Sequence, residues 1–181
     1  MMHSCHLFPE DWKPPVIATL IYVIRDEKVL LIEKKRGHGA GKVNAPGGKV
    51  TSSESLMACA VRECEEEVGI IAHNPQHRGL LRFQDLVNGF ALQGAVFVAT
   101  EFSGTLKETK EATPFWCLKS AIPYELMWED DQYWLPHVLG GKQIAGDFYF
   151  RNDQLVSWGL EIKSKFNSER GELSPSSRLP A

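Results

Sequence analysis

The chain has 181 residues, of which 43% are hydrophobic and 24% charged, close to the averages of globular proteins. This composition excludes a disordered chain, a collagen-like fibre and a disulfide scaffold, and the length fits one ordinary domain. The formal net charge of −3 provides no basic field for a nucleic-acid backbone, so we expect no nucleic-acid partner.

The sequence carries no sign of export or membrane insertion. Its longest apolar stretch, at residues 15–24, is too short to span a bilayer and lacks the charged start and cleavage site of a signal peptide. The four cysteines form no CxxC pair. We therefore expect a reduced, cytoplasmic protein that has no membrane partner and is a monomer.

Runs of β-branched and aliphatic residues predict the strands. The first two, at residues 16–25 and 29–33, are separated by a short polar turn and predict a hairpin. The later strands are expected at residues 78–83, 90–102, 114–118, 144–150 and 155–158.

Two helices are predicted between these strands. The first should begin at a polar run, where Thr51 and Glu54 have the spacing of a capping box and Ser53 is an equally good N-cap. Its helical pattern continues to Val68, and Gly69 should end it. The second helix is expected within residues 127–139.

The predicted elements give the fold class α/β (α+β), a mixed sheet packed with helices. Residues 34–42 are basic and glycine-rich and predict a mobile loop. The domain organisation has three parts: a lead-in at residues 1–14, the folded domain at 15–166 and a disordered tail at 167–181.

The segment at residues 48–70 carries two separate stripes when it is placed on a helix. One stripe is apolar and can pack against a sheet, whereas the other gathers Glu63, Glu66 and Glu67 within one turn, where like charges repel. Carboxylate oxygens suit Mg²⁺ or Mn²⁺, which can bridge phosphate oxygens and activate a water molecule. The alternative is a solvated acidic face in which Arg62 pairs with Glu66.

The spacing of these residues favours the metal site. The segment matches the pattern GX5EX7REUXEEXGU, the signature of the Nudix hydrolases, with Cys64 as a small hydrophobe at the first apolar position. The matched residues are Gly48, Glu54, Arg62, Glu63, Cys64, Glu66, Glu67, Gly69 and Ile70. The chain thus resembles enzymes that cleave a nucleoside diphosphate linked to another moiety with a divalent metal.

The resemblance implies the Nudix fold, a mixed β-sheet sandwiched between helices (α/β/α). The implied ligands of Mg²⁺, or of Mn²⁺, are Glu63, Glu66, Glu67, Glu111 and the carbonyl of Gly47. Arg62 would orient the glutamates and Glu54 would brace the loop. Glu111 could instead act as the base toward water, and the sequence does not separate these two roles.

A narrower resemblance covers residues 19–158 and points to the MutT-type members that remove oxidised purine nucleoside triphosphates. It is carried by the stretches KKRGHGAGKVNAPGGKV and PYELMWEDDQYWLP. It implies a base pocket that is formed by Asn44, Trp128, Asp130 and Asp131, lined by Thr19 and Phe83, and flanked by Lys34 at its mouth. The implied substrates are 8-oxo-dGTP and 2-hydroxy-dATP, hydrolysed to a nucleoside monophosphate and pyrophosphate to cleanse the nucleotide pool.

Two neighbouring aspartates could recognise the hydrogen-bonding edge of a base. If Asp130 and Asp131 approach one base edge, burial and repulsion should raise the pKa of one of them, so that an acid donates while its neighbour accepts. The alternative is that one of them caps the helix. Trp128 could instead be an ordinary core residue, and Asn44 could instead be a turn residue.

His38 stands where the resembled enzymes usually have an aromatic residue. It either lies in the loop without a role or contacts the rim of the pocket.

Two other functions stay open. The first is the same chemistry on another substrate, such as ADP-ribose, a dinucleoside polyphosphate or a canonical triphosphate. The second is a nucleotide sensor without catalysis, although a pure binder would not need three repelling carboxylates. A role in removing RNA caps is disfavoured by the net charge.

Overall fold

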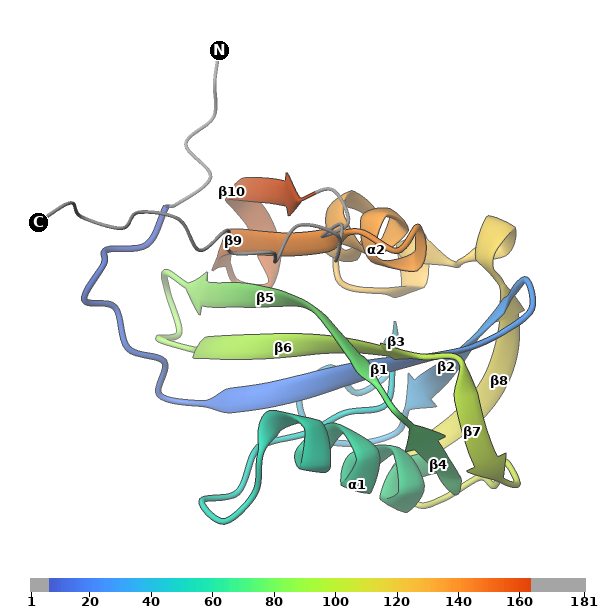
Figure 1. The fold of residues 1–181 in the computed structure, drawn as a ribbon. Coiled ribbons are helices and arrows are strands. Elements are labelled where there is room, and N and C mark those ends of the chain that lie inside the picture. Colours follow the sequence, from blue (N-terminus) through green and yellow to red (C-terminus); the bar gives the residue numbers. More distant parts are fainter. Residues whose placement is uncertain (1–6, 164–181) are drawn as a thin grey trace, which may run out of the picture.

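The computed structural model describes residues 7–163, and its centre is a mixed β-sheet with an α-helix on each face (Figure 1). The strands are β1 (Ile17–Arg25), β2 (Lys28–Lys34), β3 (Val43–Asn44), β4 (Ile70–His73), β5 (Gln76–Asp85), β6 (Ala91–Ala99), β7 (Glu101–Gly104), β8 (Ala112–Leu118), β9 (Gln143–Arg151) and β10 (Gln154–Lys163). The helices are α1 (Leu56–Val68) and α2 (Asp131–Leu139), with two short 3₁₀ turns, η1 (Lys119–Ala121) and η2 (Tyr124–Leu126).

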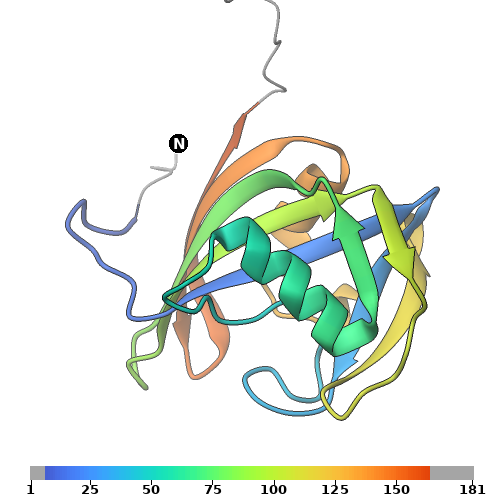
Figure 2. The same cartoon turned by 60° about the horizontal axis from the view of Figure 1, so that its bottom comes forward.

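The large sheet has the strand order β10-β9-β5-β6-β1-β2-β3, and β8 also pairs with β2. Two pairings, β1 with β6 and β5 with β9, are parallel, and the others are antiparallel. Strands β4 and β7 form a separate small sheet beside α1 (Figure 2). The predicted mixed sheet with two main helices is confirmed.

Each face of the sheet has its own hydrophobic cluster, because successive side chains of a strand point to opposite faces. On one face, Ile21 packs with Ala60 and Cys64 of α1. On the other face, the neighbouring Tyr22 packs with Trp134 of α2. The two helices therefore cover opposite sides of β1, as Figure 1 shows.

Helix α1 begins later than predicted and ends where predicted. Its N-cap is Ser55, whose hydroxyl accepts from the backbone N–H of Ala58 at 3.1 Å, so the prediction of Thr51 or Ser53 was wrong. Glu54 does accept from the N–H of Thr51 at 2.9 Å, but in the turn that precedes the helix. Gly69 ends the helix in the left-handed conformation, with φ of 76°.

The strand predictions are wrong where one continuous apolar segment of the sequence contributes strands to two different sheets. Residues 90–102 were predicted as a single strand but form β6, which pairs with β1 and β5, and β7, which pairs with β4. The short strands β3 and β4 were not predicted. Strand β10 is longer than predicted and forms a hairpin with β9 through Asn152 and Asp153, which both have positive φ.

The amino-terminal part of the described chain packs against the sheet. Phe8 is buried and stacks on Tyr149 at 4.6 Å between ring centroids, and the N–H of Leu7 donates to Asp147 at 2.7 Å. Residues 1–6 of the expected lead-in and the tail at 167–181 lie outside the described residues. Within residues 7–163, neither helix has the length and apolar character that crossing a membrane requires.

Candidate active site

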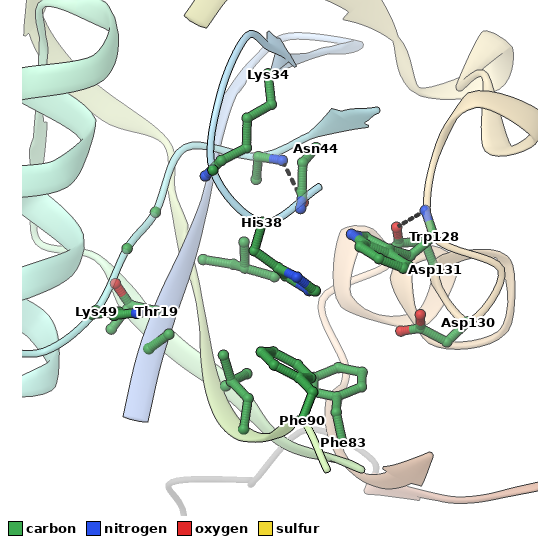
Figure 3. A pocket seen from close by; sticks show the side chains of 18 of the residues that line it. Thr19, Lys34, His38, Asn44, Lys49, Phe83, Phe90, Trp128, Asp130 and Asp131 are labelled. Atoms are coloured by element: carbon green, nitrogen blue, oxygen red, sulfur yellow. Dashed lines mark hydrogen bonds between the residues drawn. The ribbon is translucent and has the colours of Figure 1, made fainter. Parts of the chain in front are cut away.

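A cavity of about 470 Å³ lies on the α2 side of β1 and β6. Its walls come from β1, the loop before β3, the glycine loop before α1, β5, β6, β9 and the start of α2 (Figure 3). It collects Thr19, Lys34, Asn44, Gly47, Phe83, Glu111, Trp128, Asp130 and Asp131 from the predicted site. The remaining predicted residues, Arg62, Glu63, Glu66 and Glu67, lie on α1.

The glycine loop runs alongside β1 and brings α1 to the cavity. Its backbone is held by hydrogen bonds from Thr19 N to Gly48 O and from Ile21 N to Pro46 O, both 2.9 Å long. A Cβ atom on Gly47 would lie 1.9 Å from the carbonyl oxygen of Thr19. Only glycine permits this close approach of two backbones.

Two glutamates of α1 meet this loop. The N–H of Gly47 donates to Glu67 at 3.0 Å, and a Cβ atom on Gly48 would lie 2.3 Å from the carboxyl carbon of Glu63. Glu67 is buried, whereas Glu66 is exposed on the neighbouring part of the helix surface. The loop and the helix thus present two carboxylates beside the cavity wall.

Glu67 is the most perturbed of these carboxylates. Burial raises its pKa to about 7, against the lowering effects of the Gly47 N–H and of Lys34, whose Nζ lies 3.8 Å away. The nearby charges of Glu63 and Glu111 raise the pKa further. A cation at this position would relieve both the repulsion and the cost of burial.

Arg62 holds the other carboxylates in place. Its guanidinium donates twice to Glu54, at 2.7 and 2.9 Å, and also to Glu63 at 2.8 Å and Glu66 at 3.0 Å. The first partner, Glu54, has its pKa lowered to about 2, mainly by these hydrogen bonds from Arg62. The hydrogen bonds to Glu54 and Glu63 are the orienting contacts that the resemblance implies for Arg62. The hydrogen bond to Glu66 is the ion pair expected if these glutamates only form a solvated acidic surface.

The structure does not bring the predicted ligands into one coordination shell. Within residues 7–163, no three His, Cys, Asp or Glu side chains are grouped closely enough to hold a metal ion. Glu63 and Glu66 bond to Arg62, Glu67 bonds to Gly47, and Glu111 pairs with Arg36. A divalent ion would have to draw these carboxylates from their partners.

The donor set nevertheless fits a hard divalent cation. It consists of carboxylate oxygens beside a glycine loop whose backbone can approach closely. Burial raises the pKa of Glu67, and the charges of Glu63 and Glu111 add to this effect. Nudix enzymes typically use such ions. When bound, Mg²⁺ would offset the negative charge on phosphate oxygens.

The opposite end of the cavity holds two buried aspartates. Asp130 accepts from the indole N–H of Trp134 at 2.8 Å, and Asp131 accepts from the backbone N–H of Trp128 at 3.1 Å. Asp130 occupies the N-cap position of α2 but makes no capping hydrogen bond through its side chain. Helix capping therefore does not account for either carboxylate.

Burial raises the pKa of both aspartates, rather than of one as expected. For Asp130 burial outweighs the hydrogen bond from Trp134. For Asp131 the charge of Asp130 adds to the effect of burial, and only the Trp128 N–H and Lys42 oppose it. The pair therefore binds a proton more readily than ordinary aspartates do, and one acid beside one carboxylate offers both a donor and an acceptor.

Thr19 and Asn44 both line the cavity, and each also has a contact within the protein. The hydroxyl of Thr19 lies 3.4 Å from the sulfur of Cys59 on α1. Asn44 accepts from its neighbour Ala45 N at 2.8 Å, as in the turn alternative. Its amide nitrogen makes no hydrogen bond to any other described residue.

Three further aromatic side chains complete the pocket: Phe83, which was predicted, His38, which was an open alternative, and Phe90, which was not predicted. Phe83 stacks on Phe148 at 5.5 Å, and the ring of His38 lies between Phe90 and Trp128 (Figure 3). The contact of His38 with the pocket was an open alternative, whereas Phe90 was assigned only to a strand. A phenylalanine at a strand end beside a glycine was the available signal.

Comparison with known proteins places these features in a family. The model of the NUDIX domain matches residues 14–138. The oxidized purine nucleoside triphosphate hydrolase of Mus musculus is 35% identical over 83% of this chain and 97% of its own length, and that of Danio rerio is 34% identical over 77% and 90%. The crystal structure of a MutT protein from Bacillus halodurans superimposes with a TM-score of 0.73 at 31% identity, covering 81% of this chain and 97% of that one.

The family match spans more than half of the chain and includes the glycine loop, α1 and the aspartates of the pocket. The alignments with the two animal relatives extend over nearly the whole length of those proteins. The fold agrees with that of the MutT structure. The chain therefore belongs to the Nudix hydrolase family and is a hydrolase that acts on nucleoside diphosphate derivatives.

Proposed function

We propose that the protein hydrolyses oxidised purine nucleoside triphosphates, with 8-oxo-dGTP and 2-hydroxy-dATP as its leading substrates, to nucleoside monophosphate and pyrophosphate. The observation that carries the proposal is the buried Asp130–Asp131 pair beside Trp128, in the same cavity as the glycine loop of the Nudix signature. The names of the mouse and zebrafish relatives support the same substrate class. The biological role would be to keep damaged bases out of DNA.

The aspartate pair supports recognition of an altered base edge. With one proton shared between Asp130 and Asp131, the acid donates to a base carbonyl while the carboxylate accepts from a base N–H. Transfer of the proton to the other aspartate exchanges the two roles. One site can thus read the different edges of an oxidised guanine and an oxidised adenine. Trp128 offers a flat face for the purine ring.

The glutamate face supports the phosphate end of the reaction. Glu63, Glu66, Glu67, Glu111 and the carbonyl of Gly47 would hold Mg²⁺, whose charge stabilises the developing charge on the phosphate oxygens. Lys34 lies at the same end of the cavity and attracts the triphosphate. Arg62 fixes the orientation of the glutamates. The base that accepts the proton of the attacking water is Glu67 or Glu111.

Steady-state hydrolysis of a nucleotide panel with Mg²⁺ tests the proposal, with pyrophosphate and orthophosphate measured separately. We expect pyrophosphate as the released product and a higher kcat/KM for the oxidised nucleotides than for dGTP and dATP. Equal values for dGTP and 8-oxo-dGTP would remove the role in cleansing the pool. A preference for ADP-ribose or a dinucleoside polyphosphate would move the chain to another branch of the family.

Two variants separate recognition from chemistry. Asp131→Ala should lower the preference for oxidised dGTP more than it lowers the rate on dGTP, and an unchanged preference would contradict the pocket assignment. Glu67→Gln should abolish turnover. A sensor without catalysis would instead show no turnover in the parent and unaltered nucleotide affinity in this variant.

A further inference from the structure

The basic loop before β3 places a histidine ring inside the cavity. The ring centroid of His38 lies 4.3 Å from that of Phe90, with an interplanar angle of 20°, and 4.9 Å from that of Trp128, with an angle of 17°. These distances and angles are those of stacked rings. The three side chains line the cavity together (Figure 3).

The loop that carries His38 is closed by hydrogen bonds at its base and has glycines on both sides of the histidine at its tip. Its base is closed by hydrogen bonds from Gly41 N to Lys34 O at 2.7 Å and from Lys34 N to Lys42 O at 3.0 Å. Its tip has glycines with positive φ on both sides of His38, Gly37 at 76° and Gly39 at 80°. Glycines at these positions allow the histidine to rotate without moving the base of the loop.

The ring of His38 is held by stacking. Among residues 7–163, the contacts found for its imidazole are the two stacked rings, and no hydrogen bond to it is found there. Burial lowers the pKa of His38. The charges of Lys34 and Lys49 lower it further, and the charge of Asp153 raises it, but less than burial lowers it. The ring is thus a neutral planar group near pH 7, similar in thickness to a nucleobase.

We propose that Phe90 and Trp128 form a slot for the purine base and that His38 occupies this slot in the free protein, so that the base must displace His38 to bind. The inference rests on the proposed function, because it takes the substrate to be a purine nucleotide. The slot holds one ring at a time, and the free energy of the His38 stack is subtracted from that of base binding. His38 thereby sets the affinity for the base, and bases that stack weakly do not enter.

Nuclear magnetic resonance of the free protein tests the first half of the proposal. The ring protons of His38, assigned by their loss in His38→Ser, should be shifted upfield by the ring currents of Phe90 and Trp128. Addition of 8-oxo-dGMP should move them toward the positions of exposed histidines. Unshifted signals in the free protein, or shifted signals that a bound nucleotide leaves in place, would overturn the proposal.

Affinity measurements test the second half. Calorimetric titration with 8-oxo-dGMP and dGMP should give a Kd about threefold to tenfold lower in His38→Ser than in the parent, because the variant has no competing ring. His38→Phe keeps a stacking ring and should not show this gain. Pyrophosphate should bind all three proteins equally. The matched control is His77→Ser, which removes a histidine that contacts Phe97 at 5.4 Å outside the cavity and should leave every Kd unchanged.

The outcomes separate this proposal from the proposed function. A Kd that rises or stays constant in His38→Ser shows that His38 does not compete with the base, and absence of purine binding in both proteins removes the slot. If the monophosphates bind with the expected ranking but oxidised triphosphates are not hydrolysed, the slot stands and the proposed function fails.

Discussion

The guanidinium of Arg62 grips the carboxylate of Glu54 at both oxygens, from Nε to Oε2 at 2.9 Å and from Nη2 to Oε1 at 2.7 Å. The same group donates to Glu63. One side chain therefore fixes both the turn before α1 and one of the glutamates that would hold the metal. Lysine cannot form this planar, two-pronged contact. The relationship explains why an arginine without a chemical role belongs to the motif.

Arg62→Lys should therefore keep the fold and lose activity. We expect kcat/KM with Mg²⁺ to fall about 10- to 100-fold, as for other residues that orient metal ligands. Steady-state hydrolysis of 8-oxo-dGTP measures the loss, and a urea denaturation curve checks that the fold is intact. Activity at the parental level would show that the glutamates need no such support.

The two glycines of the loop should respond differently to alanine. In Gly47→Ala the new Cβ would meet the backbone of Thr19, which cannot move without distorting β1, so we expect a loss of about 3 kcal/mol in the free energy of unfolding. In Gly48→Ala the nearest neighbours of the new Cβ would be the carboxyl atoms of Glu63, at the end of a side chain, rather than backbone. This variant should stay within about 1 kcal/mol of the parent but lose activity about 10- to 100-fold. Urea denaturation measures the stability of both variants, and hydrolysis rates measure their activity. Equal losses of stability would show that the two glycines do not differ in this way.

The buried aspartates should make the protein less stable as the pH rises. Because burial raises the pKa of Asp131, the folded protein keeps a proton that the unfolded chain releases above about pH 4, so the free energy of unfolding falls from that pH upward. Asp131→Asn removes this cost and can still accept from the Trp128 N–H. We expect it to be about 1–3 kcal/mol more stable than the parent at pH 7, with the difference vanishing near pH 4. Urea denaturation at several pH values tests the trend, and lower stability of the variant at pH 7 would refute it.

A buried hydroxyl near the same pair offers a second stability test. Tyr22 is fully buried, and its OH group has no hydrogen-bond partner within the described part of the chain. Tyr22→Phe should therefore be neutral or stabilising, by up to about 1 kcal/mol, because an unsatisfied polar group is removed without a change of ring shape. A destabilised variant would show that a water molecule bridges this hydroxyl to a partner, and the urea midpoint of the two proteins distinguishes the cases.

Local patterns were sufficient to predict the motif helix and much of the sheet, but not the parts that depend on distant partners. The end of α1 was indicated by Gly69, whereas its start could not be chosen among several capping residues: the N-cap is Ser55, and the neighbouring Glu54 accepts from Arg62. Phe8 is buried against residues that are distant in the sequence, among them Tyr149, on which it stacks, and Arg82, whose guanidinium lies over its ring. No periodicity in the first residues of the chain could reveal such a contact.

The surroundings of two pocket residues differ in how far the sequence could indicate them. Thr19 has the same parity in β1 as Ile21, which packs against α1, so the alternation of the strand already indicated that its hydroxyl lies on the side of α1, where it contacts Cys59. The position of His38 between Phe90 and Trp128 depends instead on the loop conformation and on two other elements. Such a contact across three loops has no signal in spacing.

The metal requirement of the glutamate face can be tested without turnover. Glu67 is buried beside Glu63 and Glu111, so its charge is costly in the metal-free protein and favourable once a cation neutralises it. Mg²⁺ that binds only the folded state raises Tm, and Glu67→Gln should raise the metal-free Tm while losing most of this Mg²⁺-dependent increase. Glu108→Gln is the matched control, because Glu108 is an exposed carboxylate whose partners are Lys35 and Thr113, and its Mg²⁺ response should equal that of the parent. Thermal unfolding with and without millimolar Mg²⁺ measures all three proteins. An equal Mg²⁺ response in Glu67→Gln and Glu108→Gln would show that Glu67 does not hold the ion, and the metal would then have to be assigned to other oxygens of the site.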